Sequence, residues 1–410
     1  MISPGKFSHN CEAMENNTYI EKIQIGKSSL WKDNTPLLSK LDIELTERCN
    51  FKCIHCYINL PEGDKTAKSR ELSTEQVKTI LNEAASLGCL TVRFTGGEPL
   101  LREDFEELYT YTRKLGLKVI LFTNASLISP HLIELFARIP PLKEIEITVY
   151  GMCEQTYEEI TRTPGSFNLA WRGINLLLEN KIPFVVKSVL LPSNMDERKK
   201  FVSWASTIPW MDHSPNYVVF LNLRARRDLE NKNRIIKKFR LSPEESIKFL
   251  LDGNESYTKD TLEFCNHFIG PPGDNLFTCG AGLRSGCVDA YGNFQPCMLL
   301  RHPDVVYELK SGTLKDALDP FFSKEVREKK AQNSDYLSRC ARCFLKGLCE
   351  QCPAISWMEH GTLDTPVEYL CKIGHAQARY LGLLKEDELA WEVEDWEARI
   401  AQLTNKNIDQ

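Results

Sequence analysis

Short apolar runs alternate with longer amphipathic stretches over the first half of the chain. Six of these runs are candidate strands, at residues 41–46, 90–95, 117–123, 144–150, 184–191 and 217–223. Their near-continuous apolar character is typical of a parallel sheet that is covered on both faces. The stretches between them carry apolar residues at helical spacing, and several end in Gly or Lys, as helices tend to. The pattern therefore predicts successive strand–helix units.

Six strand–helix units are fewer than a closed eight-stranded barrel requires. Right-handed crossovers between parallel strands would curl the set into an open barrel. We therefore expect an α/β fold, with a partial (β/α)6 barrel over residues 39–225 that follows an N-terminal extension at 1–38. Ligands are expected at the C-terminal ends of the strands.

The second half of the chain has a different composition. The basic stretch 224–240 opens a predicted helical connection over 226–265, for which a solvated linker is favoured over a surface for an acidic substrate tail. Residues 279–371 contain eight of the 15 cysteines, which predicts a small domain over 266–385 that is stabilised by bound metal. The last segment, 386–410, reads as an acidic helix whose apolar residues pack against the body.

Overall charge and length restrict the partners. The chain has 410 residues, a net charge of −5 and a pI near 6.0, so a nucleic-acid partner is not expected. It contains no apolar stretch of membrane-spanning length, and its N-terminus lacks a signal-peptide pattern, so a cytoplasmic location without a membrane is expected. In that reducing compartment an odd number of cysteines favours metal ligation over disulfides.

Three cysteines directly follow the first predicted strand, in the sequence CNFKCIHCY. Cys49, Cys53 and Cys56 are spaced C-x3-C-x2-C, and they suit a zinc knuckle, a disulfide or a reactive metal cluster. A closed zinc site needs four ligands, and no fourth Cys or His follows closely after Tyr57. Thiolates also suit iron–sulfur clusters, and three of them leave one iron of a four-iron cluster open. His55 is expected to pack rather than to ligate.

A second motif, FTGGEPLL at 94–101, ends the second predicted strand. Gly96 and Gly97 permit close approach of the backbone to a ligand, and Glu98 supplies a carboxylate that accepts from an ammonium group. Taken alone, the motif is also explained as an ordinary strand-to-helix turn that ends at Pro99.

Together the two motifs resemble the radical S-adenosylmethionine (radical SAM) family, whose fold is a partial (β/α)6 barrel. The resemblance implies that Cys49, Cys53 and Cys56 are the catalytic and metal-binding residues and hold a [4Fe–4S] cluster with one open iron. S-adenosyl-L-methionine (SAM) would bind there, with Gly96, Gly97 and Glu98 at its amino group. Reductive cleavage of SAM would then give a 5′-deoxyadenosyl radical that takes hydrogen from the substrate.

Four further SAM contacts are implied by the same resemblance. Asn124 in FTNAS and Thr148 in EIEITVYG match family positions at the ends of two strands, and Arg162 and Lys187 are candidate partners of the SAM carboxylate. Each also has a simpler explanation: Asn124 as a turn residue, Thr148 as a hydroxyl that is hydrogen-bonded to the backbone, and Arg162 and Lys187 as members of salt bridges.

The eight C-terminal cysteines resemble the SPASM extension of radical SAM enzymes, which carries two auxiliary iron–sulfur clusters of the [4Fe–4S] type. The first cluster would take Cys279, Cys297 and Cys352, with Cys287 as the candidate fourth ligand. The second would take Cys340, Cys343, Cys349 and Cys371. One departure is that two residues separate Cys349 from Cys352, where the module usually has three. A zinc ribbon is the alternative, and Cys11, Cys89, Cys153 and Cys265 are expected to be ordinary thiols.

SPASM proteins mostly modify peptides and proteins, by crosslinking, thioether formation, oxidation or epimerisation. Sulfatase-maturating members carry an Asp where this chain has Met298, which disfavours formylglycine formation. Only 40 residues precede Leu41, so a precursor peptide would need recognition by a separate protein or by the C-terminal region. A flavodoxin or ferredoxin would be the reductant. The alternatives are a tetrapyrrole-modifying enzyme of alternative haem synthesis and, with less support, a ferredoxin-like electron carrier.

Overall fold

The structure is a computed structural model that describes residues 37–251 and 270–401. Most of the predicted N-terminal extension, the end of the connection to residue 265, and residues 402–410 lie outside the described residues, as do Cys11 and Cys265. The strands are β1 (Lys40–Thr46), β2 (Arg48–Cys49), β3 (Leu60–Pro61), β4 (Thr91–Gly96), β5 (Lys118–Thr123), β6 (Leu142–Thr148), β7 (Val185–Val189), β8 (Asn216–Val218), β9 (Ser285–Val288), β10 (Asn293–Gln295) and β11 (Tyr307–Glu308).

The helices alternate with the strands up to β8 and then form most of the C-terminal half. They are α1 (Lys65–Arg70), α2 (Thr74–Ser86), α3 (Phe105–Lys114), α4 (Pro130–Arg138), α5 (Glu154–Thr161), α6 (Ser166–Glu179), α7 (Arg198–Ala205), α8 (Glu230–Phe239), α9 (Pro243–Leu251), α11 (Leu314–Asp316), α12 (Ser334–Ser338), α13 (Lys346–Cys349), α14 (Pro353–His360) and α15 (Glu368–Tyr380). Local signals set several starts: Ser73 and Gln76 form a capping box on α2, and Ser129 caps α4 before Pro130.

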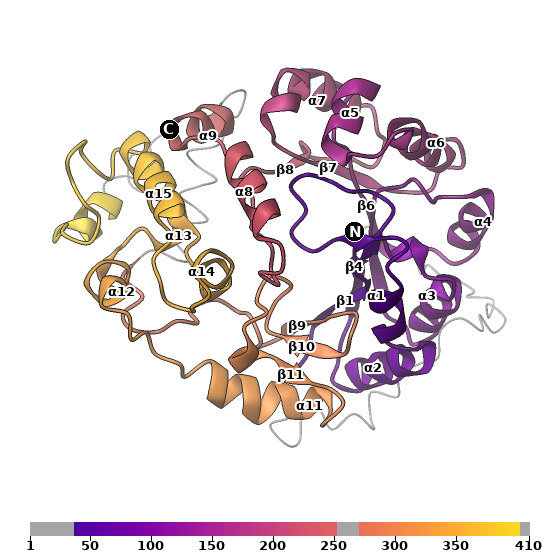
Figure 1. Cartoon of the computed structure of the whole chain (residues 1–410), viewed down its shortest axis with the longest axis horizontal. Helices are drawn as coiled ribbons and strands as arrows, with labels where there is room; N and C mark the ends of the chain where they lie inside the picture. Colours follow the sequence, from indigo (N-terminus) through magenta and orange to yellow (C-terminus); the bar gives the residue numbers. More distant parts are fainter. Residues whose placement is uncertain (1–36, 252–269, 402–410) are drawn as a thin grey trace, which may run out of the picture.

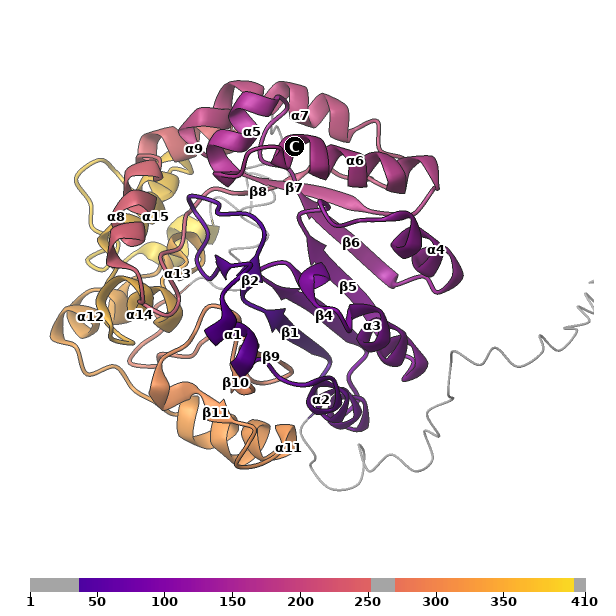
Figure 2. The same cartoon turned by 45° about the vertical axis from the view of Figure 1, so that its right-hand side comes forward.

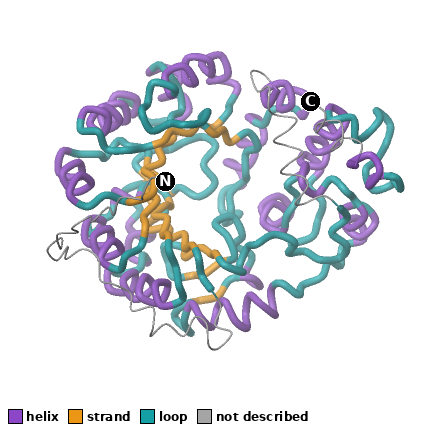
Figure 3. Tube along the Cα trace, turned by 180° about the vertical axis from the view of Figure 1, so that it is seen from behind, coloured by secondary structure: helices purple, strands orange, loops and turns teal. Residues whose placement is uncertain are grey.

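One nine-stranded sheet organises the molecule, in the order β11-β10-β9-β1-β4-β5-β6-β7-β8. The strands from β1 through β8 in that order pair in parallel, and the helices from α2 to α7 lie on the outside of the arc that they form (Figure 1). Figure 3 shows the same arrangement from behind, with the strands lining the inner side of the curve. The fold is therefore the predicted α/β partial barrel.

The two faces of the barrel sheet differ, which corrects the expectation of strands that are apolar on both faces. Leu41, Ile43 and Leu45 of β1 are buried in the core beneath the helices. Between them lies Asp42, whose carboxylate is 3.4 Å from Arg93 on β4. The inner face carries paired charges because the barrel is open, so this face is not covered by a second layer of helices.

The sixth predicted strand, 217–223, is also only partly correct. β8 ends at Val218, and the chain then leaves the sheet and runs over the loop that carries the three N-terminal cysteines (Figure 2). Leu221 and Leu223 are buried there against Ile54 and Ile58. Burial of these side chains on the loop replaces the pairing that a longer strand would have made.

The basic stretch 224–240 forms a connection that contains α8; most of it is exposed, as predicted, but two of its arginines are held by contacts within the chain. Arg224 is fully buried; its guanidinium binds Asp228 at 2.8 Å and donates to the carbonyl of Asn59 at 3.2 Å. Arg227 caps the end of α14 by donating to the carbonyls of Trp357 and Met358 at 2.8 and 2.9 Å. Because these cations already have partners within the chain, they are not free to bind an acidic substrate tail.

The cysteine-rich half is joined to the barrel by a shared sheet. β9 pairs in parallel with β1, with Cys287 opposite Asp42, and β10 and β11 continue the sheet as antiparallel strands. The predicted boundary at residue 266 therefore does not separate two independent sheets. Among the described residues, no helix is long and apolar enough to cross a membrane.

A buried charge cluster lies at this junction. Arg301, which follows β10, binds both oxygens of Glu44 on β1 at 2.8 and 2.6 Å and one oxygen of Glu47 at 3.0 Å. Tyr291 also donates to Glu47 at 3.0 Å. Burial raises the pKa of Glu44, and the charge of Arg301 opposes that rise. The cluster connects the cysteine-rich half to the strand that leads into the N-terminal cysteines.

Replacing Arg301 with Met is expected to lower the free energy of unfolding by about 3–5 kcal/mol, because it leaves the buried Glu44 carboxylate without its counter-charge, whereas Glu47 keeps Arg226. Urea denaturation followed by circular dichroism measures the change. Lys68→Met is the control, because Lys68 pairs with Glu103 at 2.8 Å on the surface. Loss of this pair should not change the urea midpoint of unfolding. Equal midpoints for the two variants would show that the Arg301 cluster does not stabilise the junction.

Candidate functional site

The three N-terminal cysteines lie on one anchored loop. It leaves the sheet after β1, makes the short β2–β3 pairing at Cys49 and Pro61, and is held at its tip by α5. There the backbone N–H groups of Lys52 and Ile54 donate to the carbonyls of Thr161 and Ile160 at 2.9 and 3.0 Å. The loop therefore has fixed ends and a fixed tip, which holds its side chains in place. We call residues 49–57 the triad loop.

The triad thiols are buried together. Cys49 and Cys53 are almost inaccessible and Cys56 is half-buried. Burial, and then the neighbouring Cys56, raises the pKa of Cys53 to about 12; burial and Cys53 also raise the pKa of Cys49. Backbone N–H groups point at two of the sulfurs, from Phe51 to Cys49 and from Asn59 to Cys56, both at 3.4 Å. Without a metal the buried thiols therefore stay protonated, and loading a cluster must release protons.

Aromatic side chains surround Cys53. Tyr150 forms a side-chain hydrogen bond with its sulfur, and the Tyr150 ring lies 5.5 Å from both His55 and Tyr157. Burial lowers the pKa of His55 to about 3, so the imidazole is neutral. His55 Nδ1 and the Tyr157 hydroxyl are buried and have no hydrogen-bond partner among the described residues. Two orphaned polar atoms beside three thiols suit a site that is completed by a bound group.

Neighbouring backbone atoms leave no room for a side chain at either glycine of the GGEP turn. A Cβ on Gly96 would lie 2.1 Å from the carbonyl oxygen of Thr46, and one on Gly97 would lie 2.2 Å from that of Arg48. The Gly97 N–H donates to Thr46 at 2.7 Å, and the Glu98 N–H donates to Arg48 at 2.9 Å. The sequence predicted close approach to a ligand, whereas the structure shows close approach to the backbone that enters the triad loop.

Glu98 and Asn124 connect the GGEP turn to the triad loop. The buried Glu98 carboxylate accepts from Thr123 Oγ1 at 2.9 Å, from the Asn124 N–H at 2.8 Å and from the Leu100 N–H at 3.1 Å. Burial raises its pKa to about 7. The Asn124 amide in turn donates to Asn50 Oδ1 at 2.9 Å and lies 3.9 Å from the Cys49 sulfur. Both residues therefore order the site through contacts within the chain.

The other three predicted SAM contacts are spread around this site. Thr148 ends β6 two residues before Tyr150, with its side chain partly exposed. Arg162 is the left-handed C-cap of α5, directly after the carbonyls that hold the triad loop. Lys187 lies inside the barrel, where it pairs with Glu146 and sits 3.4 Å from the centre of the Phe122 ring. Lys187 is thus engaged by a carboxylate of the chain and is not a free cation.

Sequence reasoning missed several residues that contact the triad. Lys232, from α8, donates to Asn59 Oδ1 at 2.6 Å, and its charge acts on Cys53 and Cys56. Tyr150 and Tyr157 are separated from the triad by about a hundred positions in the chain. The aromatic residues that follow β6 were the available signal, and core packing explains such a pattern equally well.

Three of the four cysteines predicted for the first auxiliary cluster lie together. Burial raises the pKa of Cys297 to about 12, with Cys352 and Cys279 contributing as neighbours. Cys287 has other surroundings: it is fully buried on β9, where the nearby charges are Glu44, Asp42 and Arg301. The structure therefore does not support Cys287 as the fourth ligand, because its strand pairing with β1 turns the side chain toward the charge cluster.

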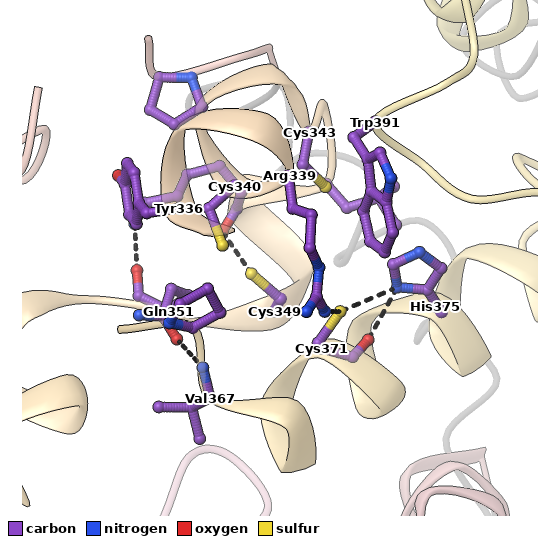
Figure 4. A pocket seen from close by; sticks show the side chains of 14 residues that line it. Tyr336, Arg339, Cys340, Cys343, Cys349, Gln351, Val367, Cys371, His375 and Trp391 are labelled. Carbon is purple, nitrogen blue, oxygen red and sulfur yellow. Dashed lines mark hydrogen bonds between the residues drawn. The ribbon is translucent and has the colours of Figure 1, made fainter. Parts of the chain in front are cut away.

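The four cysteines predicted for the second auxiliary cluster line one pocket (Figure 4). Cys340 and Cys343 flank a short 3-10 turn, Cys349 ends α13 and Cys371 lies in the first turns of α15. Burial raises the pKa of all four thiols. A Cβ on Gly374 would lie 2.7 Å from that of Cys349, so the glycine lets α13 approach α15.

The sulfur chemistry of both regions fits iron–sulfur clusters. Thiols from separate segments converge in buried surroundings, and several receive N–H donors. In the part of the chain that the structure describes, no group of three His, Cys, Asp or Glu side chains is positioned to hold a single metal ion. The fit therefore rests on which thiols share a pocket and on their donors, and not on preformed coordination distances.

Comparison with known proteins agrees with this geometry. Residues 43–205 match the family model of the Radical SAM superfamily. The AdoMet-dependent heme synthase of Methanosarcina barkeri is 25% identical over 337 residues, covering 78% of this chain and 92% of that protein. The antilisterial bacteriocin subtilosin biosynthesis protein AlbA of Bacillus subtilis is 26% identical over 326 residues, covering 76% and 68%.

Similarity in fold extends beyond the matched domain. The crystal structure of Streptococcus suis SuiB bound to its precursor peptide SuiA has a TM-score of 0.60 at 16% identity, over 82% of this chain and 76% of that chain. The family match covers the triad loop, the GGEP turn and the strands that carry them. Residues 43–205 are therefore a domain of the Radical SAM superfamily, and a cysteine-rich region follows this domain in the chain.

Proposed function

We propose that this enzyme modifies a ribosomally made peptide or a protein by radical chemistry that starts from SAM. The proposal rests on the observation that the triad loop and the GGEP turn are held together by direct contacts. Glycine contacts, the Glu98 carboxylate and the Asn124 amide hold them together beside three buried thiols. This arrangement supports a site that would hold a cluster beside the amino-acid portion of SAM.

In this proposal Cys49, Cys53 and Cys56 would hold a [4Fe–4S] cluster, and the backbone at Gly96 and Gly97 would bind the SAM amino group. With SAM bound and one electron supplied, the cluster supports cleavage to methionine and a 5′-deoxyadenosyl radical, which removes a hydrogen atom from the substrate. The neutral His55 packs against the cofactor, and Tyr150 donates to the Cys53 sulfur. Burial of the loop excludes water from the site.

The cysteine-rich region is proposed to hold two auxiliary clusters. One uses Cys279, Cys297 and Cys352, and the other uses Cys340, Cys343, Cys349 and Cys371. The names of two similar proteins support a peptide substrate: AlbA belongs to bacteriocin biosynthesis, and the SuiB structure contains a precursor peptide. A flavodoxin or ferredoxin as reductant, and a separate protein that recognises the peptide leader, complete the proposal.

A tetrapyrrole substrate is the second candidate function. The observation that favours it is the alignment with the heme synthase of Methanosarcina barkeri, which spans 92% of that protein. The paired charges inside the barrel, Asp42 with Arg93 and Glu146 with Lys187, are compatible with either a peptide or a porphyrin bearing carboxylates. A substrate assay therefore has to separate the two.

The test is anaerobic reconstitution with iron and sulfide, followed by SAM and dithionite. We expect 5′-deoxyadenosine and methionine in equal amounts; no 5′-deoxyadenosine above a protein-free background would refute the assigned chemistry. Mass spectrometry of candidate precursor peptides, and of iron porphyrins with propionate groups, then identifies the substrate. A mass change in a peptide supports the first candidate. Loss of carbon dioxide from a porphyrin, with peptides unchanged, would replace it with the second.

A further inference from the structure

The pocket of the four C-terminal cysteines contains a set of cationic and polar groups that the proposed chemistry does not yet use. We propose that Arg339 and His375, held in place by Trp391, act on the Cys371 sulfur and raise the reduction potential of the cluster in this pocket. This inference rests on the proposed occupancy of the four cysteines. It assigns these residues a positioning and tuning role that sequence motifs did not indicate.

Arg339 is fixed by contacts on three sides. Its Nη2 donates to the Cys371 sulfur at 3.7 Å, and its Nη1 donates to Glu368 at 2.6 Å. The guanidinium carbon lies 4.8 Å from the centre of the Trp391 ring, and the Nε is buried with no partner among the described residues. Figure 4 shows the guanidinium extending between the cysteines and the tryptophan. The cation is therefore held at the sulfur and is not a mobile surface charge.

His375 contributes a second group of defined orientation. Its Nε2 accepts the Ala390 N–H at 3.2 Å, so the hydrogen-bond network assigns the ring proton to Nδ1. That Nδ1–H donates to the Cys371 carbonyl at 2.8 Å and lies 3.6 Å from the Cys371 sulfur. The imidazole thus presents an N–H group, and not a lone pair, to the side of the pocket where Cys371 lies.

The segment 386–401 supplies the outer wall of this arrangement. The structure corrects the predicted acidic helix, because residues 386–395 form turns and helix is present only from 396. Trp391 packs edge-on against His375 at 5.4 Å, and Trp396 stacks on Phe344 at 6.0 Å. The predicted packing against the body is correct, and the turns are what allow Ala390 and Trp391 to reach the pocket.

The physical consequence is a more easily reduced cluster. Adding one electron from an external one-electron donor increases the negative charge on the cluster and its thiolates, without making or breaking a covalent bond. A guanidinium and an N–H group at one sulfur stabilise that added charge. Trp391 packs against both groups and so reduces the screening of the interaction by water.

The experiment is an EPR-monitored redox titration of the reconstituted full-length enzyme. The component of interest is the signal that disappears in Cys371→Ser. In Arg339→Gln we expect its midpoint to shift to a more negative potential, with the other components unchanged. Arg342→Gln is the matched control, because Arg342 is an exposed arginine beside the same cysteines and its loss changes net charge equally.

A midpoint for Arg339→Gln that equals the Arg342→Gln midpoint would overturn the proposal. If Arg339→Gln retains less iron than the wild type, His375→Phe is compared with Arg342→Gln instead. We again expect a shift of the midpoint to a more negative potential, and an unchanged midpoint would overturn the proposal. A Cys371→Ser variant with full iron content and no missing EPR component would refute the occupancy of this pocket. That result differs from an unchanged midpoint, which refutes only the tuning role.

Discussion

Replacing Cys53 with Ala is expected to abolish 5′-deoxyadenosine formation from SAM. Cys53 is the central thiol of the triad loop, is almost fully buried, and lies beside both Cys56 and the Tyr150 hydroxyl. Without it, two cysteines remain on the loop, and two ligands do not retain a four-iron cluster that normally takes three or four. The measurement is 5′-deoxyadenosine by liquid chromatography after anaerobic reconstitution, together with the iron content.

Two further cysteine variants make this result specific. Cys89→Ala is the matched control, since Cys89 is equally buried but donates to the backbone carbonyls of Thr91 and Ser39, at 3.3 and 4.0 Å; its SAM cleavage should remain at the wild-type level. Cys340→Ala should lose product formation while part of the SAM cleavage continues, because its pocket is separate from the triad. Wild-type cleavage by Cys53→Ala would remove the triad from the mechanism.

Replacing Gly97 with Ala is expected to reduce the rate of SAM cleavage by at least about 100-fold, the scale of loss that a displacement of about 1 Å causes in an active site. The added methyl group would lie 2.2 Å from the Arg48 carbonyl oxygen and 2.6 Å from that of Glu47. Both are backbone atoms, so neither can rotate away. Relief of the clash must move the GGEP turn or the strand that leads directly into Cys49.

The control for this variant is Gly63→Ala. Gly63 lies in the loop before α1, and a Cβ there would have no atom within 4 Å, so iron content and SAM cleavage should be unchanged. Comparing the variants by iron content separates two effects: a displaced triad loop lowers cluster loading, whereas a displaced GGEP turn raises the SAM concentration needed for half-maximal rate. A Gly97→Ala enzyme that behaves as Gly63→Ala would show that the close approach has no functional role.

The sequence was sufficient for the features that depend on short stretches of chain. Alternation of apolar runs and amphipathic segments located five of the six barrel strands to within a few residues, because strand and helix periodicity are local properties. The spacing of Cys49, Cys53 and Cys56, and the GGEP turn, predicted the candidate site, since such motifs must keep their own geometry wherever the chain carries them. Cys340, Cys343, Cys349 and Cys371 line one pocket, which agrees with the grouping that the family resemblance implied.

The tertiary structure alone decided the contacts between distant parts of the chain. Arg301 reaches Glu44 across 257 positions, Asn124 reaches Asn50 across 74, and Arg224 reaches Asn59 across 165. No local pattern encodes such pairs, because they arise when packing of the sheet brings unrelated segments together. The same cause surrounded Cys287 with the charges of Glu44, Asp42 and Arg301, buried Arg224 of the basic stretch, and placed Trp391 over Arg339.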